Sequence, residues 1–111
     1  MRRPPTDLTG SGRILLVEDE DSIRIIGART LNARGFTVLE ACDGEDALAV
    51  LADHGAVDLV VTDVVMPIMD GPTLIAQLLQ QTPYLKVIYT SGYAEDTFRE
   101  EIARTPGARF L

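Results

Sequence analysis

Acidic side chains and a small hydroxyl group follow three separate apolar runs of this 111-residue sequence. The polar segments are Glu18-Asp19-Glu20-Asp21, Asp63 and Thr90-Ser91-Gly92. Carboxylate oxygens without a nearby His or Cys suit Mg²⁺, which keeps several waters and takes one or two carboxylates together with phosphate oxygens. If the fold brings the three segments to one edge, they predict a magnesium-dependent phosphoryl site.

The acidic run on its own has two interpretations. An isolated run of this kind is more often a solvated loop that caps the next helix, here with Asp21 or Ser22 at the N-cap. However, like charges crowded at one site repel each other, and a divalent cation relieves that repulsion. Because Asp63 is expected at the same edge, we assign Glu18 and Asp19 to metal binding, and Glu20 and Asp21 to the surface and the cap.

Asp63 is predicted to be a nucleophile at the end of a buried strand. Pro67 keeps the following loop from coiling directly into a helix, because a residue before proline is held extended. A metal that orients a phosphoryl donor allows a carboxylate to form an aspartyl phosphate. Ser91 supplies a hydroxyl group and Gly92 a close backbone approach to a phosphoryl oxygen. On its own, an aspartate such as Asp63 is more often a cap or a salt-bridge partner, and a Ser-Gly pair such as Ser91-Gly92 is a plain turn about as often as a phosphoryl contact. The prediction therefore depends on these residues lying close together.

Strands and helices are expected to alternate along the chain. Apolar runs predict strands over residues 14–17, 37–41, 59–62, 87–89 and 108–111. Helical spacing predicts one helix that ends at Gly35, a second that follows Asp43-Gly44, and others over 71–80 and 96–103. Runs that are apolar on both faces and alternate with helices imply a doubly wound parallel α/β sheet, which binds ligands beyond the carboxyl ends of its strands.

The first helix has an apolar stripe and one apolar residue outside it. The stripe predicted to face the core consists of Ile23, Ile26, Gly27, Thr30 and Leu31. Ile25 lies on the outer face with Arg29. A single exposed apolar residue is common, but this face adjoins the acidic site. We therefore hypothesise that Ile25 and Arg29 dock a partner protein.

Composition limits the possible functions. A hydrophobic content of 46% in 111 residues is sufficient for one core, and no apolar run reaches the roughly 20 residues of a membrane helix. Residues 1–12 read as a flexible linker and 13–111 as the single domain. A net charge of −7 argues against duplex DNA as the main partner.

The cysteine and histidine content excludes other kinds of site. The single cysteine, Cys42, cannot form an internal disulfide, and with the single histidine, His54, it cannot form a Cys/His metal site. Cys42 is expected to pack near a strand end and His54 to lie at the solvent end of the second helix, neither with a functional role. The single cysteine also indicates a reducing compartment. The sequence also contains no Gly-x4-Gly-Lys-Ser/Thr motif, which excludes a P-loop nucleotide site.

Two segments, Ile14–Glu20 and Val61–Gly71, resemble receiver domains of two-component response regulators and hybrid histidine kinases. The resemblance extends from Arg13 to Leu111 and implies the flavodoxin-like, CheY-like strand order 2-1-3-4-5. It implies phosphorylation of Asp63, with Mg²⁺ held by Glu18, Asp19, Asp63 and the Val65 backbone carbonyl. It further implies Ser91 as the switch hydroxyl, Phe110 as the switch aromatic residue, and Gly92 and Tyr93 beside the phosphoryl group.

Within this family, Thr62–Pro67 and Ser91–Asp96 look most like the receiver at the end of a hybrid histidine kinase of the alphaproteobacterial cell-cycle type. That similarity implies a cytoplasmic domain of a parent kinase anchored in the inner membrane. It also implies a histidine phosphotransferase as the partner that exchanges phosphoryl groups with Asp63. Such a domain is not an enzyme by itself, since it catalyses only its own phosphotransfer and dephosphorylation, and it contacts neither nucleic acid nor membrane.

The sequence departs from the family pattern at its end. The family has a lysine after the fifth strand and then a fifth helix, and Leu111 precedes both. We expect an exposed apolar sheet face beside the first helix, and dimerisation or segment exchange through it.

Two other functions stay open. A phosphatase of the haloacid dehalogenase type usually needs a second Asp two residues after its nucleophile, where this sequence has Val65. A phosphorylation-deficient docking module is the other alternative, and the intact set of Glu18, Asp19, Asp63 and Ser91 argues against it.

Overall fold

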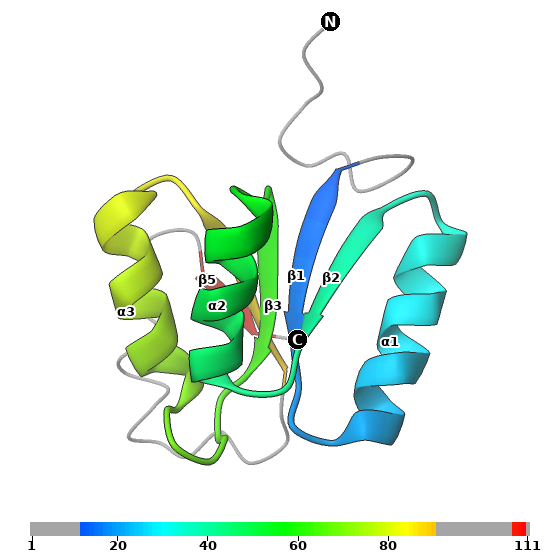
Figure 1. The fold of residues 1–111 in the computed structure, drawn as a ribbon, viewed down its shortest axis with the longest axis horizontal. Coiled ribbons are helices and arrows are strands. Elements are labelled where there is room, and N and C mark those ends of the chain that lie inside the picture. Colours follow the sequence, from blue (N-terminus) through cyan, green and yellow to red (C-terminus); the bar gives the residue numbers. More distant parts are fainter. Residues whose placement is uncertain (1–11, 91–107, 111) are drawn as a thin grey trace, which may run out of the picture.

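The fold is built on a five-stranded parallel sheet with the strand order β2-β1-β3-β4-β5. The computed structural model describes residues 12–90 and 108–110, and it describes side chains for 12–90. The strands are β1 (Arg13–Val17), β2 (Thr37–Ala41), β3 (Leu59–Asp63), β4 (Lys86–Thr90) and β5 (Ala108–Phe110), and the helices are α1 (Asp21–Ala33), α2 (Gly44–His54) and α3 (Gly71–Gln81). Figure 1 shows this arrangement. The predicted fold class and strand order are confirmed.

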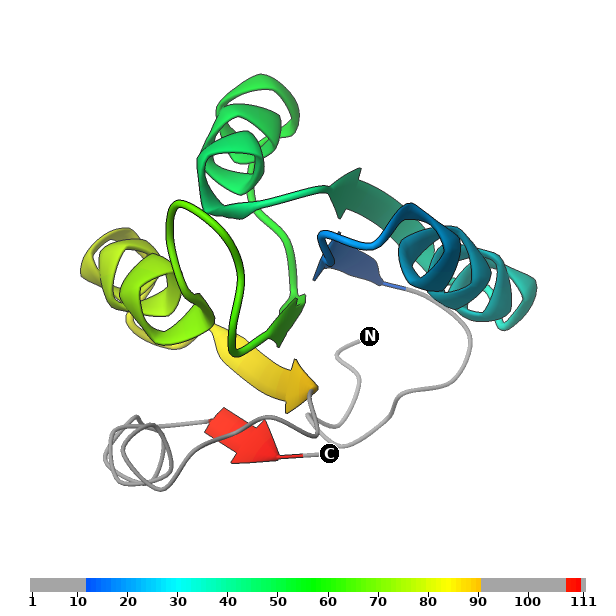
Figure 2. The same cartoon turned by 90° about the horizontal axis from the view of Figure 1, so that it is seen from below.

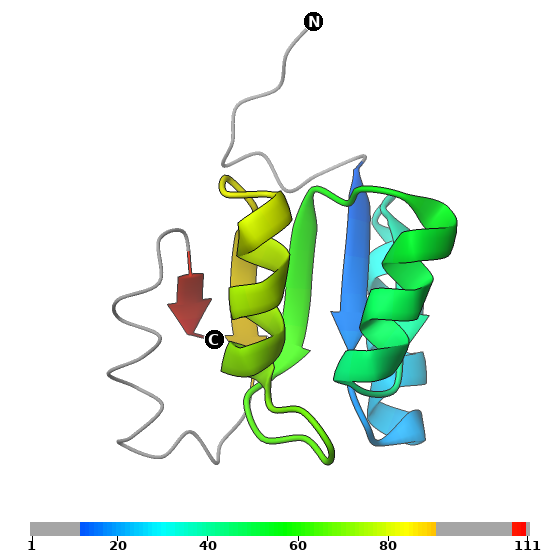
Figure 3. The ribbon, with the colours of Figure 1, turned by 60° about the vertical axis from the view of Figure 1, so that its left-hand side comes forward.

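The helices form layers on both sides of the sheet. Viewed from below, α2 and α3 lie on one face and α1 lies on the other (Figure 2). Because all strands run in the same direction, their carboxyl ends meet at one edge, as the arrowheads in Figure 3 show. The loops that follow β1 and β3 therefore begin at the same edge, where ligands of doubly wound sheets bind.

Aspartate side chains cap the N-termini of two of the three described helices. Asp43 accepts a hydrogen bond from the Asp46 backbone N–H at 2.8 Å, and Asp70 accepts one from the Thr73 N–H at 2.8 Å. The expectation that Asp21 or Ser22 caps α1 is wrong, because Glu20 is the N-cap and its side chain makes no capping hydrogen bond. The first turn of α1 thus depends on other contacts.

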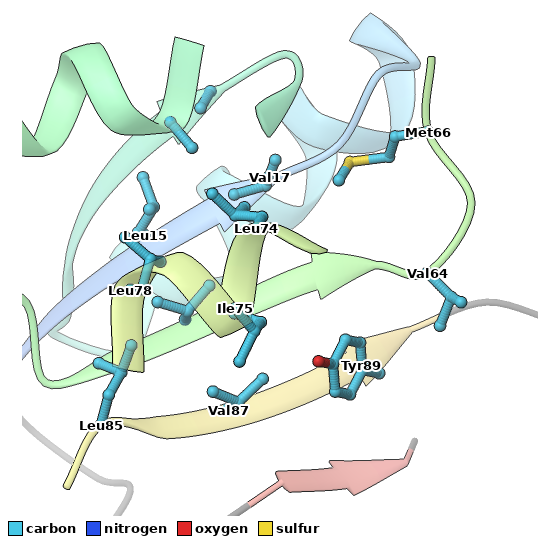
Figure 4. Packing of buried hydrophobic residues seen from close by; sticks show 13 residues of the cluster. Leu15, Val17, Val64, Met66, Leu74, Ile75, Leu78, Leu85, Val87 and Tyr89 are labelled. Carbon is cyan, nitrogen blue, oxygen red and sulfur yellow. The ribbon is translucent and has the colours of Figure 1, made fainter. Parts of the chain in front are cut away.

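The hydrophobic core lies between the sheet and the helices α2 and α3. Figure 4 shows side chains of α3 packed against those of the central strands and against Tyr89. The largest apolar side chains that are fully buried in this core are Leu15, Val17, Val60, Val64, Leu74, Ile75, Val87 and Tyr89. Packing of these residues fixes the positions of β1, β3 and β4, and therefore of the strand ends that follow.

The orientation of α1 agrees only in part with the prediction. Of the expected stripe, Ile23, Gly27, Thr30 and Leu31 line an open groove that faces the sheet, so Ile23 is still 53% exposed. Ile26 does not line this groove and is 64% exposed, more than Ile25 at 43%. Ala28 is instead the buried residue of α1, and Arg24 is also turned inward. Helical spacing identifies an apolar stripe but not which element covers it, and the elements α1 packs on are β1 and β2.

An apolar groove of about 530 Å³ runs between α1 and the sheet. It is lined mainly by Ile14, Leu16, Ile23, Leu31, Val61 and Ile88. This groove is the exposed apolar sheet face that was expected beside the first helix.

Several predictions concern residues outside the described part of the chain. They are the linker up to Ser11, the helix over 96–103, and the site residues Ser91, Gly92 and Tyr93. The backbone of Phe110 lies in β5, in register with Tyr89 of β4, and its side chain is outside the described set.

Candidate functional site

Three carboxylates meet at the edge where the strands end. Glu18 and Asp19 follow β1 directly, and Asp63 is the last residue of β3. β1 and β3 are hydrogen-bonded neighbours, with Val17 in register with Thr62. One carboxylate oxygen from each of the three acidic residues lies within 4.8 Å of the others. The fold therefore brings together the three residues that the sequence assigned to a metal.

Glu18 is the buried member of this group, with 8% of its surface exposed. Its Oε2 accepts a hydrogen bond from the Glu20 backbone N–H at 3.0 Å, and its own N–H donates to the Ala41 carbonyl at 3.0 Å. Burial raises the pKa of the Glu18 carboxyl, and the nearby Asp19 and Asp63 raise this pKa further. A cation bound here would offset both the burial and the repulsion.

The donor set fits a hard divalent cation. It offers carboxylate oxygens from a buried, a half-buried and an exposed residue, and no nitrogen or sulfur ligand. Mg²⁺ binds through few carboxylates and keeps several waters, so an open cluster of this kind matches its requirements better than those of Zn²⁺. Exposed acidic groups also occur without a metal, and the burial of Glu18 distinguishes this cluster from a solvated acidic loop.

Asp63 is held in position by its own loop. The Val64 backbone N–H donates to Asp63 Oδ1 at 2.9 Å, and the Gly71 N–H donates to the Val64 carbonyl at 2.8 Å, which closes the β3–α3 loop. A Cβ atom at Gly71 would collide with the Asp63 backbone carbonyl and would lie 3.2 Å from the Tyr89 ring. Only glycine allows α3 to begin this close to Asp63.

The tip of the β3–α3 loop has an unusual backbone. Ile68 has a φ of 72°, and the Met69 N–H donates to the Pro67 carbonyl at 2.7 Å, which is the pattern of a γ-turn with positive φ. Met66 is buried on one side of this turn, and Met69 packs against Gly44 on the other. The side chain of Val65, whose carbonyl is an expected metal ligand, is 47% exposed.

The sequence analysis missed Arg24, Gly71 and Ile68. Arg24 was overlooked because it falls between the isoleucines of an apparently apolar helix face, and no local signal marks it as buried. Gly71 could have been noticed, because a glycine at the start of a helix directly after Asp70 has no capping function to explain it. No sequence pattern identifies a β-branched residue at positive φ, which such residues rarely adopt.

The remaining predicted residues are placed as follows. Thr90 ends β4 in register with Asp63, so Ser91 follows in the sequence the residue that pairs with Asp63. Ile25 and Arg29 are exposed on α1, as predicted. His54 is exposed at the end of α2, as predicted. Cys42 directly follows the end of β2, but its side chain is exposed, so the expectation that it packs there is wrong.

Comparison with known proteins places the chain in a family. Residues 14–111 match the response regulator receiver domain. The chain is 53% identical over 107 residues to the sensor kinase CckA of Brucella abortus (strain 2308), a match that covers 96% of this chain and 11% of that relative. It thus spans about a tenth of that kinase.

None of the described helices is both long and apolar enough to cross a membrane.

Solved structures support the same assignment. The receiver domain from the hybrid histidine kinase CckA superposes with a TM-score of 0.75 at 44% identity, over 90% of this chain and 83% of that chain. The chemotaxis protein CheY4 of Vibrio cholerae superposes with a TM-score of 0.82 at 25% identity, over 92% and 86% of the two chains. The chain therefore belongs to the response regulator receiver domains, the phosphoacceptor modules of two-component signalling, and is a homologue of the CckA receiver domain.

Proposed function

We propose that Asp63 is the phosphoacceptor of this domain and that its phosphorylation depends on Mg²⁺ held by Glu18, Asp19 and Asp63. The observation that carries the proposal is the meeting of these three carboxylates within 4.8 Å at the carboxyl edge of the sheet. The Val65 backbone carbonyl is proposed as a further ligand, because it lies in the loop that Asp63 begins.

The chemistry is transfer of a phosphoryl group from a phosphohistidine. One Asp63 carboxylate oxygen bonds to phosphorus while the bond from phosphorus to the imidazole nitrogen breaks, and the imidazole leaves with that electron pair. A bound Mg²⁺ would neutralise charge on the phosphoryl oxygens. The protein itself holds Asp63 in place: the Val64 N–H bonds to the carboxylate at Oδ1, and Gly71 packs closely against the Asp63 backbone carbonyl.

Ser91 and Phe110 are proposed as the switch pair. Support comes from the chain order, since Ser91 directly follows Thr90, the register partner of Asp63, and from the backbone of Phe110, which lies on the neighbouring strand β5. In this proposal, phosphorylation draws the Ser91 hydroxyl group inward and the aromatic ring follows. Gly92 and Tyr93 would border the phosphoryl group and regulate the access of water.

We further propose that the domain works inside a hybrid histidine kinase anchored in the inner membrane, on its cytoplasmic side. Its partners would be the kinase domain of that protein and a histidine phosphotransferase. The exposed face of α1 that carries Ile25 and Arg29 is the proposed docking surface, and the exposed Ile26 adds apolar area beside it. The α1–sheet groove is the proposed contact in a dimer of the domain.

A hydrolytic enzyme is the less favoured candidate. A phosphatase of the haloacid dehalogenase type needs a second acid two residues after its nucleophile, and the residue there is Val65, with an exposed apolar side chain. Such an enzyme would turn over an external phosphate monoester, whereas the proposed receiver takes up one phosphoryl group for each chain.

The test is a mass measurement. The domain is incubated with Mg²⁺ and acetyl phosphate, or with a phosphorylated histidine kinase, and the intact protein is weighed. The expected result is a gain of one phosphoryl group that is absent with EDTA and absent in Asp63→Asn. If neither this chain nor a version continued past Leu111 gains mass, the proposal is wrong. If Asp63→Asn gains the same mass, another residue is the acceptor.

A further inference from the structure

Helix α1 turns a charged residue inward while two of its isoleucines remain at the surface. The Arg24 side chain is 14% exposed, whereas Ile23 and Ile26 are 53% and 64% exposed. Charged side chains are rarely this buried unless they are paired, and burial of isoleucine would be the more favourable choice for stability alone. The contacts of Arg24 therefore need an explanation beyond packing.

The guanidinium group of Arg24 joins three separate segments. Nη1 donates to the Glu18 backbone carbonyl at 2.9 Å, and Nη2 donates to Asp21 Oδ1 at 2.7 Å. Nε lies 3.4 Å from Glu40 Oε1 on β2. A planar guanidinium with five donors can make such contacts simultaneously, which a lysine ammonium on its flexible stem cannot reproduce.

These contacts surround the β1–α1 loop. Glu18, whose backbone carbonyl Arg24 binds, offers a carboxylate to the acidic cluster, and Asp19 is the next residue. The loop lacks a side-chain cap at the start of α1, because the Glu20 side chain makes no capping bond. Arg24 is thus the side chain that ties this loop to both α1 and β2.

We infer that Arg24 is a positioning residue for the metal site: it fixes the backbone of Glu18 so that the carboxylates of Glu18 and Asp19 converge with that of Asp63. The inference rests on the proposed function, since it concerns the same Mg²⁺ site. Side chains that orient metal ligands from outside the coordination shell typically change metal affinity by about 10-fold to 100-fold when they are removed.

Electrostatics and positioning predict opposite results for the loss of Arg24. If its positive charge only adds to the local field, removing it should strengthen the binding of a cation, because like charges repel. If Arg24 holds the loop, removing it should weaken the binding, because the loop must be ordered when the metal binds. The sign of the change in affinity separates the two roles.

The experiment is a Mg²⁺ titration of the folded domain, followed by amide chemical shifts. We expect Arg24→Met to bind Mg²⁺ about tenfold more weakly than the wild type. Arg34→Met, which removes the same charge from the exposed C-terminal end of α1, serves as the matched control and should bind with unchanged or slightly higher affinity. Arg24→Met that binds as tightly as the control, or more tightly, overturns the inference.

A second variant covers the case in which Arg24→Met does not fold. Arg24→Lys keeps the charge and loses the planar fork, so weaker Mg²⁺ binding by this variant supports positioning, and unchanged binding overturns it. A wild-type domain that shows no saturable Mg²⁺ shift would refute the proposed metal site itself. That outcome is distinct from equal binding by the wild type and Arg24→Met.

Discussion

Replacement of Gly71 by alanine tests whether close packing under Asp63 holds the site together. The added Cβ would collide with the Asp63 backbone carbonyl and would lie 3.2 Å from both the Tyr89 ring and the Val64 Cα atom. Backbone atoms and a fully buried ring cannot give way as the end of a flexible side chain can. The strand end that carries Asp63, or the start of α3, must therefore move.

The size of the effect follows from two opposing contributions. Overpacking of a dense core costs about 1–3 kcal/mol, and a clash with backbone belongs in the upper part of that range. The higher helix propensity of alanine offsets at most about 1 kcal/mol, and less at the first residue of a helix. We expect a net loss of about 2 kcal/mol in the free energy of unfolding, which is roughly 8 °C in Tm for a domain of this size.

The assay is urea and thermal unfolding followed by circular dichroism, with and without Mg²⁺. Because the Asp63 carbonyl moves, the stabilisation of Gly71→Ala by Mg²⁺ should also be smaller than that of the wild type. Gly27→Ala is the matched control within α1. There the nearest atom to a new Cβ is the terminal Cδ2 of Leu16 at 3.1 Å, in a side chain that borders the open groove.

The control should be neutral or slightly stabilising, because Leu16 can shift and alanine favours a helix interior by up to about 1 kcal/mol. A Gly71→Ala protein as stable as the wild type would refute the reasoning. The same conclusion would follow if Gly27→Ala lost as much stability as Gly71→Ala.

Four further predictions concern other parts of the domain. The pKa of Glu18 is raised from its ordinary value of 4.5, so the fold favours the protonated carboxyl. The stability that this protonation contributes is complete below pH 4.5 and is lost as the pH rises through the raised pKa. In EDTA at neutral pH, Glu18→Gln should therefore be more stable than the wild type. If the urea midpoints of the two proteins change with pH in the same way, this prediction is wrong. Asp43→Ala removes the cap of α2 and should cost about 1 kcal/mol in urea unfolding, with no change of the Mg²⁺ response. Ile68→Gly relieves the positive φ and should add up to about 1 kcal/mol to the free energy of unfolding, and a loss would show that the turn is unstrained. Light scattering at high protein concentration should show a dimer, and a monomer would count against association through the groove.

The residue pattern alone indicated the fold class and grouped the three acidic residues of the site, and the resemblance to receiver domains supplied the strand order. Short strands apolar on both faces, separated by helices, are compatible with few arrangements other than a doubly wound parallel sheet. In such a sheet the residues that follow β1 and β3 meet at one edge, so Glu18, Asp19 and Asp63 could be grouped without coordinates.

Only the tertiary structure decided which side chains of α1 are buried and what fixes the loops of the site. Helical spacing identifies which residues of α1 share a face, but the elements packed against the helix select the face that is buried. The contacts with β1 and β2 place Arg24 inward and leave Ile23 and Ile26 exposed. In the same way, the need for glycine at position 71 arises from the Asp63 carbonyl and the Tyr89 ring, which reach it from two strands. Such requirements come from atoms distant in sequence, so they appear only when the chain is folded.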